Sequence, residues 1–180
     1  VEPEKRMYPL ALGAGVSEEG FVLKYAMPDM NVTTGQEKPE EDPVSVLTLA
    51  GRNFQEIEEV YNRSQEKFLD LGHLQVVILD ESMLTEENRK AFLEYLKQEE
   101  HVGEDVYMFR TGMLGEVFHW KGAEDSSVGE YLQGIQENRT TGQQKKGVTL
   151  REAYHQLYQD GTLPWIPSVW VNGDLLEVDY

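Results

Sequence analysis

The sequence contains no cysteine, and this absence excludes several kinds of chemistry at once. Without thiols the chain has no disulfide, no thiolate nucleophile, no cysteine-ligated zinc and no iron–sulfur cluster. It also lacks a run of about 20 apolar residues, which a helix needs to cross a bilayer. No signal peptide is visible. Because the first residue is Val1 rather than methionine, we expect the gene product to have a segment upstream.

Positive charge is also scarce. The chain has 16 Lys and Arg residues against 33 Asp and Glu residues, which gives a formal net charge of −17. A phosphate backbone attracts clustered cations, and anionic lipid head groups repel a body of this charge. Nucleic-acid binding and electrostatic membrane binding are therefore excluded as main activities. The 39% of hydrophobic residues in 180 nevertheless predict a folded chain with a sizeable core.

Hydrophobic patterning predicts an α/β fold with a mixed sheet flanked by helices. The predicted strands are residues 8–16, 21–27, 44–50, 73–79 and 106–111. One helix is predicted from the cap Asn53 to a stop at Gly72, and a second from the cap Thr85 to about residue 100. This alternation of strands and helices requires crossover connections, and therefore some parallel strand pairs. The nearly continuous apolar run at residues 73–79 is typical of a central strand buried on both faces.

The predicted organisation changes after residue 122. We expect an N-terminal α/β domain at residues 1–122 and part of a smaller α+β domain at residues 123–180. Two capping boxes, at Ser127 and Thr149, predict two helices in this second segment, and Asn172-Gly173 predicts a β-hairpin. Residues 28–43 and 139–147 are predicted to be an exposed acidic loop and a polar linker. Because the chain ends at Tyr180 in an apparent strand, we expect the second domain to continue beyond it.

No motif in the sequence indicates a cofactor, a metal or a catalytic set. The four histidines do not form a metal-binding pair, and acidic pairs such as Asp80-Glu81 lack the alternating ligand spacing of a calcium loop. Gly13-Ala14-Gly15 follows a strand but precedes a turn and another strand, whereas a phosphate cradle precedes a helix. These glycines therefore indicate close backbone packing inside a sheet.

An aromatic strip follows the strand at residues 106–111. Phe118, His119 and Trp120 are consecutive, and two interpretations remain open for them. One is an exposed patch that binds a partner, and the other is a packing strip between the two predicted domains.

The order of several segments is distinctive. A strand of small residues at 10–16 is followed by a helix, then by Gly-His-Leu-Gln-Val-Val-Ile-Leu at residues 72–79, then by an acidic-start helix and a strand. Later come Val-Thr-Leu-Arg-Glu-Ala-Tyr at residues 148–154 and Leu-Pro-Trp-Ile-Pro at residues 163–167. Over nearly its whole length the chain resembles the C-subunit family of bacterial spore germinant receptors, the Ger(x)C lipoproteins.

The resemblance implies a non-catalytic module at the outer face of the cytoplasmic membrane, which in the spore is the inner membrane. A lipid on a cysteine just upstream of Val1 would tether it, and integral membrane subunits that sense nutrients would be its partners. We therefore expect the module to act by binding those subunits, through the sheet edge, the aromatic strip or the acidic loop. The candidate partner-binding residues are His73, Gln75, Phe118, Trp120 and Trp165.

Two other functions remain open. The first is a nutrient-binding domain, with a cleft between the two segments and Trp120, Trp165 or Trp170 as its wall. The second is a hydrolase, which needs two carboxylates about 5 to 10 Å apart in a cleft.

Overall fold

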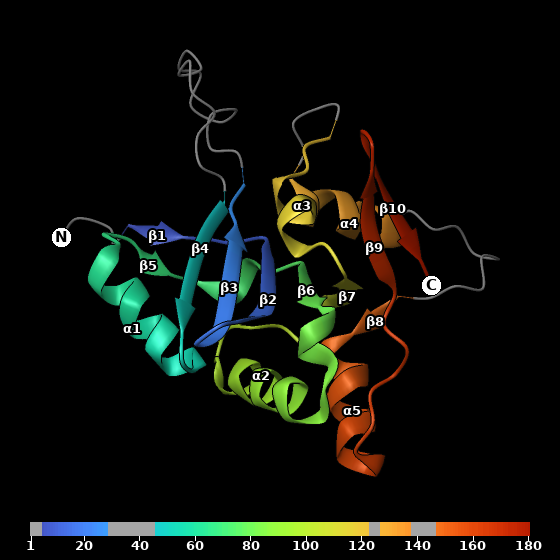
Figure 1. Cartoon of the computed structure of the whole chain (residues 1–180), viewed down its shortest axis with the longest axis horizontal. Coiled ribbons are helices and arrows are strands. Elements are labelled where there is room, and N and C mark those ends of the chain that lie inside the picture. Colours follow the sequence, from blue (N-terminus) through green and yellow to red (C-terminus); the bar gives the residue numbers. More distant parts are fainter. Residues whose placement is uncertain (1–4, 29–45, 123–126, 138–146) are drawn as a thin grey trace.

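One large mixed sheet forms the centre of the protein (Figure 1). The computed structural model describes residues 5–28, 46–122, 127–137 and 147–180. The strand order is β10-β9-β7-β6-β2-β3-β4, and β8 also pairs with β7. The strands of this sheet are β2 (Ala11–Ser17), β3 (Gly20–Ala26), β4 (Val46–Gly51), β6 (Val76–Asp80), β7 (Tyr107–Thr111), β8 (Val148–Thr149), β9 (Ser168–Asn172) and β10 (Leu175–Asp179). A separate short pair joins β1 (Arg6–Met7) to β5 (Phe68–Leu69).

The sheet has a parallel centre and antiparallel sides. Strands β2, β6, β7 and β9 are parallel neighbours, whereas β3 and β4 on one side and β10 on the other pair antiparallel. Strand β6 lies at the centre, and its residues from Val76 to Leu79 have no exposed surface. The predicted α/β class, with a mixed sheet and a central strand buried on both faces, is confirmed.

Helices cover both faces of the sheet. The helices are α1 (Phe54–Ser64), α2 (Glu86–Gln98), α3 (Leu114–His119), α4 (Val128–Glu137) and α5 (Leu150–Asp160). Apolar residues of α1, α2 and α5 share one core with Leu12 and Val77 of the sheet. Residues of α3 and α4 share a second core with Ala11 and Ile78, which point to the opposite face. No described helix is long and apolar enough to cross a membrane.

The predicted helix starts and the predicted hairpin are confirmed. Asn53 caps α1 by accepting a hydrogen bond from the Glu56 N–H at 2.8 Å, and Thr85, Ser127 and Thr149 occupy the same position before α2, α4 and α5. Strands β9 and β10 form the hairpin around Gly173, whose φ of 61° lies in the left-handed region. These short-range signals therefore act as the sequence indicates.

The segment between α1 and β6 differs from the prediction. Helix α1 ends at Ser64 rather than at the predicted stop, Gly72, and Gly72 does not have the positive φ that is typical of a glycine after a helix. Instead, a 3₁₀ turn at Leu71–His73 is capped by Asp70, whose Oδ1 accepts from the Gly72 N–H at 2.9 Å. This turn also moves the start of the strand from His73 to Val76, because its backbone is committed to the turn.

The C-terminal segment joins the same sheet. Ser168 of β9 pairs with Arg110 of β7, and β8 pairs with the start of β7, so strands from either side of residue 122 are hydrogen-bonded to each other. The division into domains at residue 122 stays a prediction. The predicted acidic loop lies outside the described residues apart from Pro28, and the predicted linker lies outside them apart from Gly147.

Helix α3 approaches the sheet closely because Gly13 has no side chain. A Cβ atom added at Gly13 would lie 2.5 Å from Cε2 and 2.7 Å from Cζ of Phe118. Phe118 is only 3% exposed, and its ring occupies the space that a side chain at residue 13 would need. The expectation of close packing at the glycines of β2 is confirmed at this position.

Replacing Gly13 with alanine therefore destabilises the fold. We expect Gly13→Ala to lower the free energy of unfolding by about 1–3 kcal/mol, the usual cost of overpacking a core. Urea denaturation measures the change. Gly115→Ala is the matched control, because an added Cβ there meets nothing within 4 Å and alanine favours a helix. An unchanged stability of Gly13→Ala would contradict the close contact with Phe118.

Candidate functional site

His73 and Gln75 lie just before β6, at the amino end of the parallel strands. His73 is exposed, and its ring centroid lies 4.5 Å from that of Tyr8. The Gln75 backbone is part of the sheet, since its N–H donates to Leu10 O at 2.8 Å and its carbonyl accepts from the Tyr107 N–H at 3.1 Å. The Gln75 side-chain Oε1 is buried without a hydrogen-bond partner among the described residues. Most buried polar atoms in proteins have such a partner.

The three residues of the predicted aromatic strip differ in exposure: Phe118 is buried, His119 is exposed and Trp120 is half-buried. Phe118 is buried beneath α3, so an exposed patch that includes Phe118 is wrong, because the missing side chain at Gly13 draws its ring into the sheet. Trp120 is half-buried, with its Nε1 donating to Asp174 O at 3.1 Å and its ring 4.7 Å from that of Tyr131. Trp120 therefore fixes the end of α3 to the β9–β10 turn and to α4.

Trp165 is a predicted site residue whose side chain lies exposed at the surface. It is 66% exposed, and the Arg110 guanidinium lies 3.7 Å from its ring centroid. Arg110 is itself anchored, because its Nε donates to Ser168 Oγ at 3.3 Å. A cation over the face of an indole is attracted by the ring's quadrupole. The contact holds an exposed aromatic ring in one place.

The structure does not bring the predicted residues to one site. Trp120 packs against the core of the α3 and α4 face, whereas Trp165 stacks on Arg110, which shares its face of β7 with Met108 of the core under α1, α2 and α5. The sheet therefore separates Trp120 from Trp165. These two rings do not form the wall of one cleft.

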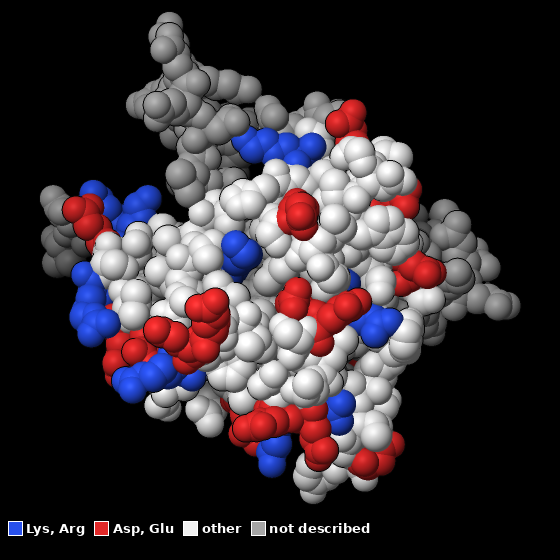
Figure 2. All heavy atoms as spheres, viewed as in Figure 1, with Lys and Arg blue, Asp and Glu red and all other residues white. Residues whose placement is uncertain are grey.

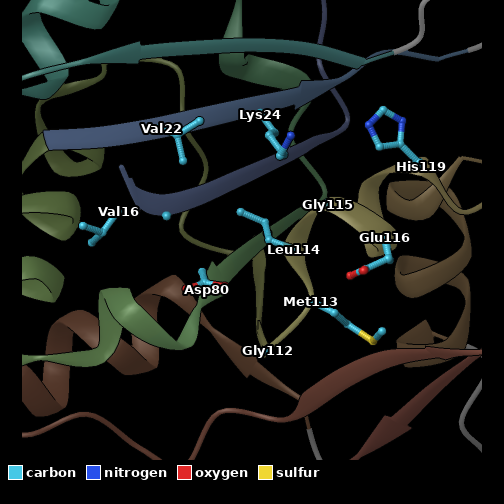
Figure 3. A pocket seen from close by; sticks show the side chains of 11 residues that line it. Val16, Val22, Lys24, Asp80, Gly112, Met113, Leu114, Gly115, Glu116 and His119 are labelled. Carbon is cyan, nitrogen blue, oxygen red and sulfur yellow. The ribbon is translucent and has the colours of Figure 1, made fainter. Parts of the chain in front are cut away.

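A pocket that sequence reasoning missed lies beside α3, at the carboxyl ends of β2 and β6 (Figure 3). Its volume is about 640 Å³, and Gly15, Lys24, Asp80, Glu116 and His119 are among its lining residues. Ligands of open α/β sheets bind outside the carboxyl ends of the strands. Asp80 directly follows the predicted central strand at residues 73–79, and a carboxylate at that end of a strand is the signal in the sequence that could have indicated the pocket.

A pair of carboxyl groups lies at the α1–α2 contact, away from this pocket. Tyr95 Oη donates to Glu58 Oε1 at 2.9 Å. Burial and the hydrogen-bonded Glu58 carboxylate beside it raise the pKa of Glu99 from 4.5 to about 8. The Glu99 carboxyl therefore keeps its proton at neutral pH.

Comparison with known proteins identifies the family. The family described as the spore germination protein N-terminal domain matches residues 1–170 of this chain. The chain belongs to this family. The membership confirms the resemblance drawn from residues 72–79 and the order of the segments.

A curated relative of this germination domain is the spore germination protein GerQC of Bacillus cereus. The two are 28% identical over 126 residues, an alignment that covers 67% of this chain and 34% of that protein. The match therefore spans about a third of the length of the relative. No solved structure matches the germination domain.

The raised pKa of Glu99 predicts that the stability of the fold depends on pH. Because folding raises the pKa of Glu99 from 4.5 to about 8, its contribution is complete below pH 4.5 and is lost as the pH rises through 8. Glu99→Gln keeps a hydrogen-bond donor to Glu58 but cannot ionise. We expect this variant to be more stable than the wild type by about 1–2 kcal/mol at pH 9, a value reduced for the partial exposure of Glu99.

Thermal unfolding from pH 5 to pH 9 measures this dependence. Glu94→Gln, at an exposed position on the same helix, is the control and should follow the wild-type profile. If Glu99→Gln loses stability between pH 5 and pH 9 as steeply as the wild type, Glu99 is not the source of the pH dependence.

Proposed function

We propose that this germination domain is the amino-terminal part of a nutrient germinant receptor subunit, and that it acts by binding other subunits rather than by catalysis. The family match over residues 1–170 carries this proposal, and the name of the Bacillus cereus relative supports it. The partners are integral membrane subunits of the same receptor.

The charge of the chain fits a position beside a membrane but not in contact with its lipids. A lipid anchor outside this chain supplies membrane affinity, and the net charge of −17 keeps the body away from anionic head groups. Figure 2 shows that the acidic side chains on one face lie in separate groups, with basic side chains among them over α1 and α2. The domain would stand at the outer face of the spore inner membrane.

Trp165 is the best candidate for the contact with a partner subunit. Tryptophan and arginine are the residues that most often dominate binding energy at protein interfaces. The stacked Arg110 already orders the exposed ring, which lowers the entropic cost of binding. His73, which also lies exposed against an aromatic ring, is a second candidate. Trp120 is less suited, because its indole N–H and its ring already have partners within the domain.

The role of Trp165 is tested in the full-length protein in spores. We expect Trp165→Ala to reduce co-purification with the receptor's membrane subunits by about tenfold or more, the cost of removing a central interface residue. Phe68→Ala is the matched control, because Phe68 is an aromatic residue that is 59% exposed on the separate β1–β5 pair. Undiminished co-purification of Trp165→Ala, or an equal loss with Phe68→Ala, would place the contact elsewhere.

A further inference from the structure

The large sheet has an open edge at each end, at β4 and at β10 (Figure 1). Among the described residues, β4 pairs only with β3 and β10 pairs only with β9. No other backbone hydrogen bond of the described residues reaches the backbone of residues 46–50 in β4. The outward N–H and C=O groups of such an edge form a row with which a further strand can pair.

The two edges differ in their protection against such pairing. Natural edge strands are usually blocked by charged side chains, prolines or bulges. Strand β10 carries two charged residues, Glu177 and Asp179, among its five. Strand β4, with the sequence Val-Leu-Thr-Leu-Ala-Gly, has no charged residue and no proline. Its register with β3 is continuous from Val46 to Gly51, without a bulge. Strand β4 is therefore the edge that is open to a partner.

Strand β4 also offers apolar surface on both faces of the sheet. Leu47 and Leu49 are half-buried against the core beneath α1, and Val46 is half-buried against the core on the α3 face. A strand laid along β4 points its side chains alternately to the same two faces. Apolar side chains of that strand cover the exposed parts of these residues, which adds hydrophobic burial to the backbone hydrogen bonds.

A pocket at the end of β4 adds a preference for positive charge. Its volume is about 500 Å³, and the last two residues of β4 line it together with Glu18, Glu19, Arg52 and Glu56. Arg52 Nε is paired with Glu56 Oε2 at 3.1 Å. Glu18 and Glu19, in the turn between β2 and β3, have no ion-pair partner in the described part of the chain. These two carboxylates leave the pocket negative, so it attracts a cation.

Charge decides between the possible occupants of this edge. A second copy of the chain also has a net charge of −17, so two copies repel each other. Its own β4 offers no lysine or arginine to the pocket. A segment of a different protein, with apolar residues and a lysine or arginine beside them, satisfies both the edge and the pocket.

We propose that β4 binds an extended segment of another protein, which adds a strand to the sheet and places a lysine or arginine side chain against Glu18 and Glu19. The backbone hydrogen bonds supply affinity, and the basic side chain fixes the register. The inference goes beyond the subunit-binding role and does not depend on it. Trp165 stacks on Arg110 of β7, whereas β6, β2 and β3 lie between β7 and β4.

Nuclear magnetic resonance on the ¹⁵N-labelled 180-residue chain tests the proposal. The probe is the synthetic peptide acetyl-Lys-Thr-Val-Thr-Val-Thr-Lys-amide, whose terminal lysines reach the pocket in either strand direction. We expect it to shift the amide signals of Thr48 and Leu49 saturably, and to slow hydrogen exchange at the amide that points away from β3. The amides of Leu175 and Leu176 on the β10 edge are the reference signals and should not change. The proposal is overturned if the β4 signals do not respond.

Two matched peptides separate strand pairing from charge. Replacing both lysines with glutamates keeps the strand but reverses its charge, and we expect this peptide to bind about tenfold or more weakly. Replacing both valines with prolines keeps the lysines but removes backbone donors, and we expect no slowing of hydrogen exchange in β4. Equal binding of the glutamate peptide would overturn the role of the pocket, and equal protection by the proline peptide would overturn the strand pairing.

Variants of the chain test the named residues. Ala50→Lys puts a cation on the edge beside the pocket, and we expect it to weaken binding of the lysine peptide about tenfold. Leu175→Lys, at a position that is 60% exposed on β10, is the matched control and should bind like the wild type. Glu18→Gln combined with Glu19→Gln should remove the preference for lysine over glutamate. Unchanged binding in Ala50→Lys would overturn the site, and a preference that survives the double variant would overturn the charge contact.

The other occupants of the edge are tested on the free chain. We expect analytical ultracentrifugation to show a monomer, and the outward amides of β4 to exchange freely without the peptide. A dimer that Ala50→Lys dissociates and Leu175→Lys does not would make the occupant a second copy. Outward amides of β4 that are already protected in the monomer would mean that the chain covers its own edge. Either result would overturn the proposal.

Discussion

The whole architecture depends on the burial of β6. This strand is apolar on both faces, and its residues from Val76 to Leu79 have no exposed surface. Such a strand needs a neighbour at each edge and helices over each face. The parallel neighbours β2 and β7 supply the edges, and parallel pairing requires long connections. Those connections carry α1 and α2 over one face, and the chain after β7 carries α3 and α4 over the other.

The cover on the two faces is formed differently, and the pocket results from that difference. On one face, three helices pack with large aromatic residues such as Phe54 and Phe92. On the other face, the short helix α3 lies against β2 at Gly13, and β3 beside it presents Lys24 and Val22. The close contact of α3 with β2 thus leaves an open pocket between α3 and the neighbouring strand β3. The position of α3 is what brings Glu116 from one part of the chain to the same space as Lys24.

The acidic residues have two separate effects, one from the net charge of the chain and one from the contacts of single carboxylates. The net charge of −17 restricts the surfaces that the whole domain approaches. Locally, carboxylates have structural roles: Asp70 caps a turn and pairs with Arg6 at 3.0 Å, and burial beside Glu58 raises the pKa of Glu99. The net charge can be counted from the sequence. The contacts of single carboxylates depend on which residues the fold brings together.

The sequence alone determined the α/β class, the buried central strand, the helix caps at Asn53, Thr85, Ser127 and Thr149, and the family. Each of these signals acts on neighbouring residues, because a cap or an apolar run satisfies or buries its own stretch of backbone. Only the tertiary structure decided that α1 ends at Ser64, that Phe118 is buried, and that Lys24, Asp80 and Glu116 line one pocket. Phe118 is buried because Gly13, distant in the chain, lacks a side chain beneath it. Such contacts between distant segments depend on the packing of the whole sheet, which no local pattern records.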